Sequence, residues 1–191
     1  IYQEHIKYLV GNDKQLELFN YMEQYIANIL FTPGKLPKVG LILRSESKQI
    51  GKNLFFSKFF ENTLFKTAIL DTTKPDQIFG RFGGSDHKFV ITINESTMKS
   101  NYDLMENIKS AITDPHQSVE KKGIDTETYL NVARYIFFSN NFNCVKIEQG
   151  DRRFVACNNI DKAKPRDYYN KLRHALDDKK RLLCYINYLG T

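Results

Sequence analysis

The segment Gly51-Lys52-Asn53 has the residue types of a phosphate-binding site, and a short apolar run at residues 39–43 precedes it. A glycine lets backbone N–H groups turn into one hollow at the start of a helix, whose dipole attracts anions. A lysine there reaches the β- and γ-phosphates, and a small oxygen-bearing side chain holds magnesium. We therefore predict that Lys52 binds phosphate and that Asn53 ligates Mg²⁺. The predicted nucleotide-binding residues are Ser47, Lys48, Gln49, Ile50, Gly51, Lys52 and Asn53.

This loop departs from the usual signature, G-x-x-x-x-G-K-[ST], at two positions. Asn53 replaces the final serine or threonine, and its carbonyl oxygen can still ligate magnesium directly or through water. Glu46 stands at the first glycine position, where we expect it to reduce backbone freedom and to bring a negative charge toward the phosphates. The motif alone does not separate a phosphate loop from a chance Gly-Lys pair. The strand before it and the helix after it favour the phosphate loop.

A second candidate lies at the end of the apolar run 89–93, which is followed by Asn94 and Glu95. In nucleoside triphosphatases a carboxylate at such a strand end orients or deprotonates the attacking water, so we predict that Glu95 is catalytic. Asn94 stands where an aspartate commonly supports magnesium, so we predict that Asn94 is a second magnesium ligand, although it lacks that charge. The alternative is an ordinary strand that leaves the core through polar residues.

A third candidate is Asn140, which follows the run Tyr135-Ile136-Phe137-Phe138-Ser139. An amide at the carboxyl end of a strand beside a phosphate loop can hydrogen-bond the γ-phosphate or the water. The alternative is a turn, which an Asn-Asn pair readily begins.

Asp151, Arg152 and Arg153 form a fourth candidate. A guanidinium inserted into a neighbouring subunit's site would stabilise charge on the transferring phosphoryl group. The alternative is a surface ion pair between Asp151 and one of the two arginines.

Strands and helices are expected to alternate along the chain, which is typical of an α/β domain with a mostly parallel central sheet flanked by helices. We predict strands near residues 38–43, 67–70, 88–93, 135–139 and 153–157. We predict a first helix that is capped by Asn12 or Asp13 and carries Leu16 on its apolar stripe. Further helices are predicted to begin at Gly51, to span 76–79 and about 102–112, and to form the end of the chain. The charged stretch 118–125 is expected to be a hairpin tip.

The predicted organisation is one domain with three parts: an N-terminal helical segment (1–37), a core (38–160) and a C-terminal helical segment (161–191). The first residue is Ile1, so we interpret the chain as part of a larger protein. Its 191 residues carry a net charge of +6, which favours a polyanionic partner, although a lysine-rich solvated surface would give the same charge.

The three cysteines form no Cys-x-x-Cys pair, so a reducing, intracellular location is expected and a zinc or disulfide framework is not. There is no apolar run of membrane-spanning length and no secretion signal, so no membrane partner is predicted.

Taken together, these motifs resemble those of superfamily 3 helicases of viruses, phages and mobile elements, a branch of the AAA+ ATPases with a P-loop fold. More narrowly, the chain is similar to the motor domain of viral-type primase-helicases. The resemblance spans roughly residues 39–156 and includes the segments 108–113 and 119–123 besides the motifs above.

The resemblance implies a hexameric ring that hydrolyses ATP with Mg²⁺ at subunit interfaces and moves single-stranded DNA through its pore, in the cytoplasm of a host cell or at a viral replication site. It assigns phosphate binding to Lys52, water activation to Glu95 and a polar sensor to Asn140, with Arg152 or Arg153 acting in trans. Lys121 and Lys122 fall where the family carries a DNA-contacting pore hairpin, and cations on such a tip can follow a phosphate backbone without reading bases.

Two functional interpretations remain open. A third, a basic α/β domain that binds no nucleotide, would require four coincidences at four strand ends. The first is an active ATP-dependent DNA helicase motor. The second is a degenerate, catalytically weak ATPase-like module that serves in oligomerisation and single-stranded DNA binding. The ordered set of Lys52, Glu95, Asn140 and the arginines favours the first, whereas Glu46, Gln49, Ile50 and Asn94, which depart from the family pattern, favour the second.

Overall fold

A computed structural model describes the chain except residues 12–14, 80–87, 95–101, 120–125 and 142–146. Its centre is a five-stranded sheet in the order β2-β3-β6-β1-β7, and all of its pairings are parallel. The strands are β1 (Gly40–Ser45), β2 (Ile69–Thr72), β3 (Val90–Asn94), β6 (Arg134–Ser139) and β7 (Phe154–Asn159). Because parallel strands run in one direction, their carboxyl ends meet at a single edge of the sheet.

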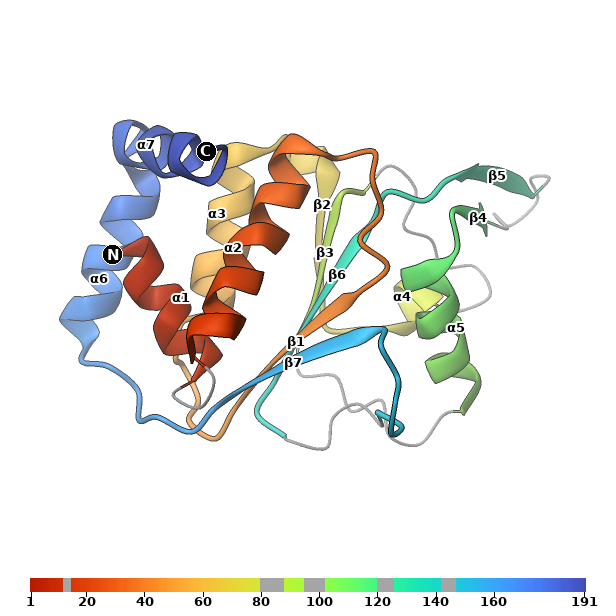
Figure 1. Ribbon diagram of the computed structural model, residues 1–191, viewed down its shortest axis with the longest axis horizontal. Coiled ribbons are helices and arrows are strands. Elements are labelled where there is room, and N and C mark those ends of the chain that lie inside the picture. The colour runs from red at the N-terminus through yellow and green to blue at the C-terminus, as the bar shows by residue number, and fades with distance from the viewer. Residues whose placement is uncertain (12–14, 80–87, 95–101, 120–125, 142–146) are drawn as a thin grey trace.

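Helices lie on both sides of this sheet and give the molecule three layers (Figure 1). One side carries α1 (Tyr2–Val10), α2 (Gln15–Phe31), α3 (Lys52–Thr63), α6 (Arg166–Asp177) and α7 (Lys179–Leu189), and the other carries α4 (Asp76–Phe79) and α5 (Tyr102–Thr113). A separate antiparallel ribbon, β4 (His116–Val119) and β5 (Glu127–Leu130), extends beyond α5. Both faces of a parallel sheet are apolar, so both must be covered.

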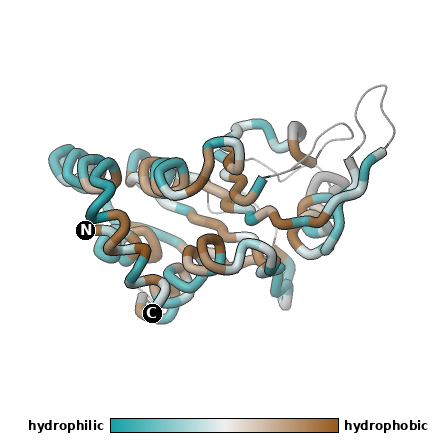
Figure 2. Tube along the Cα trace, turned by 90° about the horizontal axis from the view of Figure 1, so that it is seen from above, coloured by the Kyte–Doolittle hydropathy of each residue, from teal (hydrophilic) through white to brown (hydrophobic). Residues whose placement is uncertain are grey.

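Alternate residues of the central strands enter two separate cores. Leu41 and Leu43 of β1 pack with α1, α2 and α3, whereas Ile42 packs with α4 and α5. Viewed from above, hydrophobic residues are concentrated on the strands and on the helix sides that face them (Figure 2). This alternation is the period of two that strand geometry imposes.

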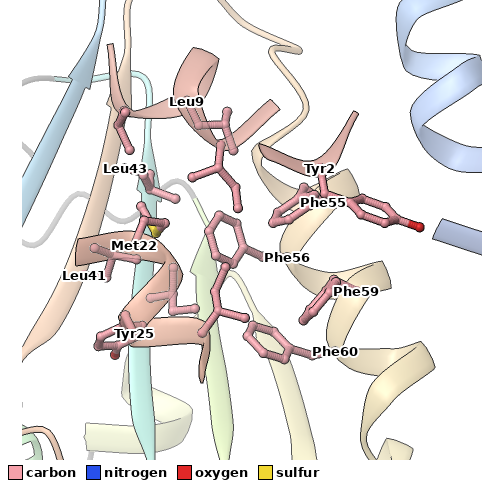
Figure 3. Packing of buried hydrophobic residues seen from close by; sticks show 14 of the residues in the cluster. Tyr2, Leu9, Met22, Tyr25, Leu41, Leu43, Phe55, Phe56, Phe59 and Phe60 are labelled. Carbon is pink, nitrogen blue, oxygen red and sulfur yellow. The ribbon is translucent and has the colours of Figure 1, made fainter. Parts of the chain in front are cut away.

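Helix α3 is anchored by the phenylalanines Phe55, Phe56, Phe59 and Phe60, which are fully buried. They project from α3 toward the side chains of α2 and β1 (Figure 3). Burial of a phenylalanine side chain contributes about 1.5–3 kcal/mol. The helix is therefore held firmly against the sheet, and this fixes the position of its first residue, Lys52.

The predicted α/β class and parallel sheet are confirmed, and the predicted strands are observed with boundaries shifted by at most two residues. One expectation needs correction, and one helix was not predicted. Leu16 is 70% exposed, because it shares a helix face with the exposed Asn20. Helix α1 was not predicted individually, although its Ile6 and Leu9 are buried. The predicted cap at Asn12 or Asp13 lies outside the described residues. The same holds for residues 120–125 of the predicted hairpin tip at 118–125, whose first two residues belong to β4.

Within the part of the chain that the structure describes, no helix is both long and apolar enough to cross a lipid bilayer.

Candidate functional site

The loop at residues 46–51 connects the carboxyl end of β1 to α3 and contains two residues with positive φ, Gln49 at 59° and Gly51 at 86°. A Cβ added to Gly51 would lie 2.9 Å from Cε1 of His5 and 3.1 Å from Cε1 of Tyr169, so both the dihedral angle and the available space require glycine. Glu46 does not have a positive φ, so this position does not require glycine, contrary to expectation. Its backbone N–H donates to the carbonyl oxygen of Asn159, 3.2 Å away.

Lys52 is the first residue of α3, and its side chain is buried against the carboxyl edge of the sheet. Its Nζ donates to Ser45 Oγ (2.5 Å), the carbonyl oxygen of Ser139 (2.9 Å) and Asn140 Oδ1 (3.0 Å). These acceptors meet because β1 pairs with β6, with Arg44 opposite Ser139. The structure thus brings the predicted phosphate-binding lysine together with the predicted sensor Asn140.

A cavity of about 1020 Å³ lies beside this contact, at the carboxyl edge of the sheet. It is large enough for a nucleotide-sized ligand. Every charged side chain of its described lining is a cation, and carboxylates are absent from that lining. The lining residues are Gln49, Ile50, Gly51, Lys52, Asn53, Leu54, Thr73, Asn94, Phe138, Ser139, Asn140, Ala163, Lys164, Arg166, Tyr169 and Arg173.

The C-terminal part of this lining was not predicted as functional. Arg166, Tyr169 and Arg173 stand at positions i, i+3 and i+7 of α6, so they share one face of that helix. Lys164 precedes the helix, and its backbone N–H donates to the hydroxyl of Tyr169 at 2.9 Å. The regular spacing of cationic and aromatic residues was visible in the sequence, but only the fold shows that it faces the loop at 46–51.

The two predicted magnesium ligands, Asn53 and Asn94, line the same cavity. Asn94 is nine-tenths buried, and its Nδ2 donates to Asp71 Oδ1. Its Oδ1 is buried and has no hydrogen-bond donor among the described residues. Magnesium prefers oxygen ligands and usually keeps several waters, so an amide oxygen without a donor fits the outer or inner sphere of this ion. Within the described residues, no group of three or more His, Cys, Asp or Glu forms a metal cluster.

Arg152 and Arg153 lie far from this cavity, at the amino edge of the sheet. The carbonyl oxygen of Arg153 accepts from the N–H of Gly40, the first residue of β1, at 2.8 Å. Its guanidinium lies 3.4 Å from Asp151 Oδ2, which is the ion pair expected under the alternative interpretation. The structure therefore does not bring the arginines to the site of their own chain. Glu95, Lys121 and Lys122 lie outside the described residues.

His5 of α1 contacts the loop, and its role was also not predicted. Its Nε2 lies 3.3 Å from the carbonyl oxygen of Gly51, and its Nδ1 lies 3.2 Å from the hydroxyl of Tyr168. A carbonyl oxygen only accepts, so these partners favour the tautomer with the proton on Nε2. Burial lowers the pKa of His5 to about 4, although the hydrogen bond to Gly51 opposes this shift.

This histidine is expected to make stability depend on pH. The folded state keeps His5 neutral down to about pH 4, whereas the unfolded chain protonates it near its ordinary pKa of about 6.5. As the pH falls through this window, wild-type stability should decrease by about 1.4 kcal/mol for each pH unit relative to His5→Phe. Urea unfolding of both proteins between pH 4.5 and 7.5 measures this difference, and parallel pH profiles would contradict it.

A family model described as "Family of unknown function (DUF5906)" matches residues 43–153, which is more than half of the chain. No curated protein matches the sequence.

Two solved structures share the fold. The apo structure of the NrS-1 C-terminal region has a TM-score of 0.73 and 20% sequence identity, and the match covers 91% of this chain and 44% of that one. An A-form apo structure of the same region has a TM-score of 0.73 and 19% identity, with 95% and 44% covered. The chain therefore spans less than half the length of these structures.

Proposed function

We propose that this chain, which belongs to the family of unknown function DUF5906, is the nucleotide-binding motor of an ATP-dependent DNA helicase used in viral, phage or mobile-element genome replication. The observation that carries this proposal is the contact between Lys52 and Asn140, beside a cavity whose described charged lining is wholly cationic. In open α/β sheets ligands bind outside the carboxyl ends of the strands, and a cationic hollow at a helix start suits a polyphosphate.

The finer fold assignment, a P-loop ATPase of the AAA+ type, is part of the same proposal. Its support is the strand order, because β6 lies between β1 and β3. Lys52 follows the loop that leaves β1, on one side of β6. Glu95 immediately follows Asn94, the last residue of β3, on the other side of β6. In this arrangement Lys52 offsets charge on the phosphates, Glu95 holds and deprotonates the water, and Asn140 hydrogen-bonds the γ-phosphate. A magnesium ion would neutralise further phosphate charge when bound.

The remaining roles require further molecules. Arg152 and Arg153 stand at the opposite edge of the sheet, so in a homo-oligomeric ring they would act on the ATP of a neighbouring subunit. Lys121 and Lys122 occur between the paired strands β4 and β5, and we assign them to contacts with the backbone of single-stranded DNA.

The alternative, a catalytically weak ATPase-like module for oligomerisation and DNA binding, is favoured by one observation. The N–H of Glu46 already donates to Asn159, so this amide is committed to the fold and does not face a phosphate. A loop with fewer free amides should bind the nucleotide less tightly.

ATP turnover with and without single-stranded DNA separates the two functions. We expect turnover that DNA stimulates, and a reduction of about 10²–10⁴-fold in Glu95→Gln with nucleotide binding retained, because the amide cannot take a proton from water. Glu106→Gln, which changes an exposed glutamate on α5, is the matched control and should retain turnover. DNA binding without any turnover in the parent protein would support the alternative instead.

A further inference from the structure

Asp71 and Asn94 are hydrogen-bonded partners on the neighbouring parallel strands β2 and β3. Asp71 Oδ1 also accepts from Thr92 Oγ1 at 2.9 Å, and its Oδ2 accepts from Ser57 Oγ of α3 at 3.2 Å. Three donors from two elements therefore fix the position of this carboxylate.

This contact sets the orientation of the Asn94 amide. The Nδ2 atom must face Asp71, because a carboxylate only accepts hydrogen bonds. The Oδ1 atom consequently faces away from Asp71, where it is buried and has no donor within the described part of the chain. A buried acceptor without a partner is unfavourable, so a cation or a hydrogen-bond donor placed beside Asn94 Oδ1 would be bound favourably.

The pair also lies where the nucleotide cavity meets a smaller one. Asn94 and Thr73 line both cavities, and Asp71 lines the smaller one, of about 410 Å³. The described lining of the larger cavity supplies cations for phosphate but no carboxylate for a divalent cation. Asp71 places a negative charge directly behind Asn94, at the junction of the two.

We propose that Asp71 is a positioning residue for the divalent cation that accompanies the nucleotide. Asn94 Oδ1 binds this cation, or a water on it, while Asp71 holds the amide in the required orientation and supplies the missing charge from the adjacent strand. A carboxylate behind a ligand raises the basicity of that ligand and fixes its direction. This inference rests on the proposed function, and it explains how an asparagine can stand where an aspartate is usual.

Binding of Mn²⁺ in the presence of ADP, followed by electron paramagnetic resonance, tests the proposal. Asp71→Asn removes the charge and allows the Asn94 amide to reverse, so its Mn²⁺ affinity should fall by about tenfold or more. Its affinity for ADP in EDTA should stay unchanged. Asp177→Asn is the matched control, because Asp177 also accepts from α3, through Lys58 at 2.7 Å, and lies outside the lining of both cavities.

The exchange Asp71→Asn with Asn94→Asp tests the same idea by rescue. It moves the carboxylate onto β3 and keeps the net charge, so the Mn²⁺ affinity should return to within about threefold of the parent value. This recovery can be distinguished from the roughly tenfold loss expected for Asp71→Asn alone. It also remains informative if the single variant fails to fold. An unchanged Mn²⁺ affinity in Asp71→Asn, or failure of the exchange to restore it, would overturn this inference alone. If the parent protein does not bind ADP even in EDTA, the proposed function is wrong and the inference falls with it.

Discussion

Replacement of Lys52 by alanine is expected to lower kcat/KM for ATP by about 10²–10³-fold, the effect of removing one preorganised donor from a site that develops charge. The ammonium group is held at the carboxyl edge of the sheet by Ser45, Ser139 and Asn140. ATP can therefore meet a positive charge whose position is already fixed. The measurement is steady-state ATP turnover at saturating single-stranded DNA, together with ADP affinity.

The same helix provides the control. Lys58 also lies on α3, but its Nζ pairs with Asp177 at the molecular surface, 2.7 Å away. Lys58→Ala should therefore retain turnover within about twofold, because an exposed ion pair contributes at most about 1 kcal/mol to stability and has no contact with the cavity. Equal turnover in the Lys52 and Lys58 variants would show that the cavity beside Lys52 does not bind the phosphates.

The parts of this site that sequence reasoning reached are those that depend on strand direction. Apolar runs bounded by polar residues located the strand that ends at Asn94 and the strand that ends before Asn140. Another such run precedes the loop that leads to Lys52. Parallel strands place their carboxyl ends at one edge of the sheet, so the predicted α/β class places Lys52 and Asn140 at the same edge. Their direct contact also requires that β1 and β6 be neighbouring strands, as the structure shows.

The parts that sequence reasoning missed depend on lateral strand order and on distant segments. Asp71 supports Asn94 only because β2 lies beside β3, and a run of four residues contains no signal for that neighbour. Arg166 and Arg173 line the cavity beside the loop at 46–51, although they follow it by more than 100 residues in the sequence. They reach it because α6 packs against α3. Glu46 was expected to reduce backbone freedom at the first glycine position, but the positive φ values of the loop fall at Gln49 and Gly51.

Arg134 is a further residue whose importance appears only in the fold. It begins β6, is 1% exposed, and donates to backbone carbonyl oxygens of the turn that follows α2. These contacts are to Thr32 at 2.9 Å, Pro33 at 2.6 Å and Lys35 at 2.8 Å, with Asn28 Oδ1 at 3.1 Å. Carbonyl oxygens at a helix C-terminus lack intrahelical donors and carry partial negative charge, so a guanidinium suits them. Burial lowers the pKa of Arg134.

Arg134→Met should therefore destabilise the protein by about 3–5 kcal/mol, because several buried carbonyl oxygens lose their donor at once. Arg134→Lys should recover only part of this loss, since an ammonium has three donors and lacks the planar fork of a guanidinium. Urea unfolding at neutral pH measures both. The matched control is Arg181→Met, which removes an arginine that is 69% exposed and paired with Asp178 on the surface, and it should change stability by no more than about 0.5 kcal/mol. If Arg134→Met is as mild as Arg181→Met, the guanidinium is not what holds the end of α2 against the sheet.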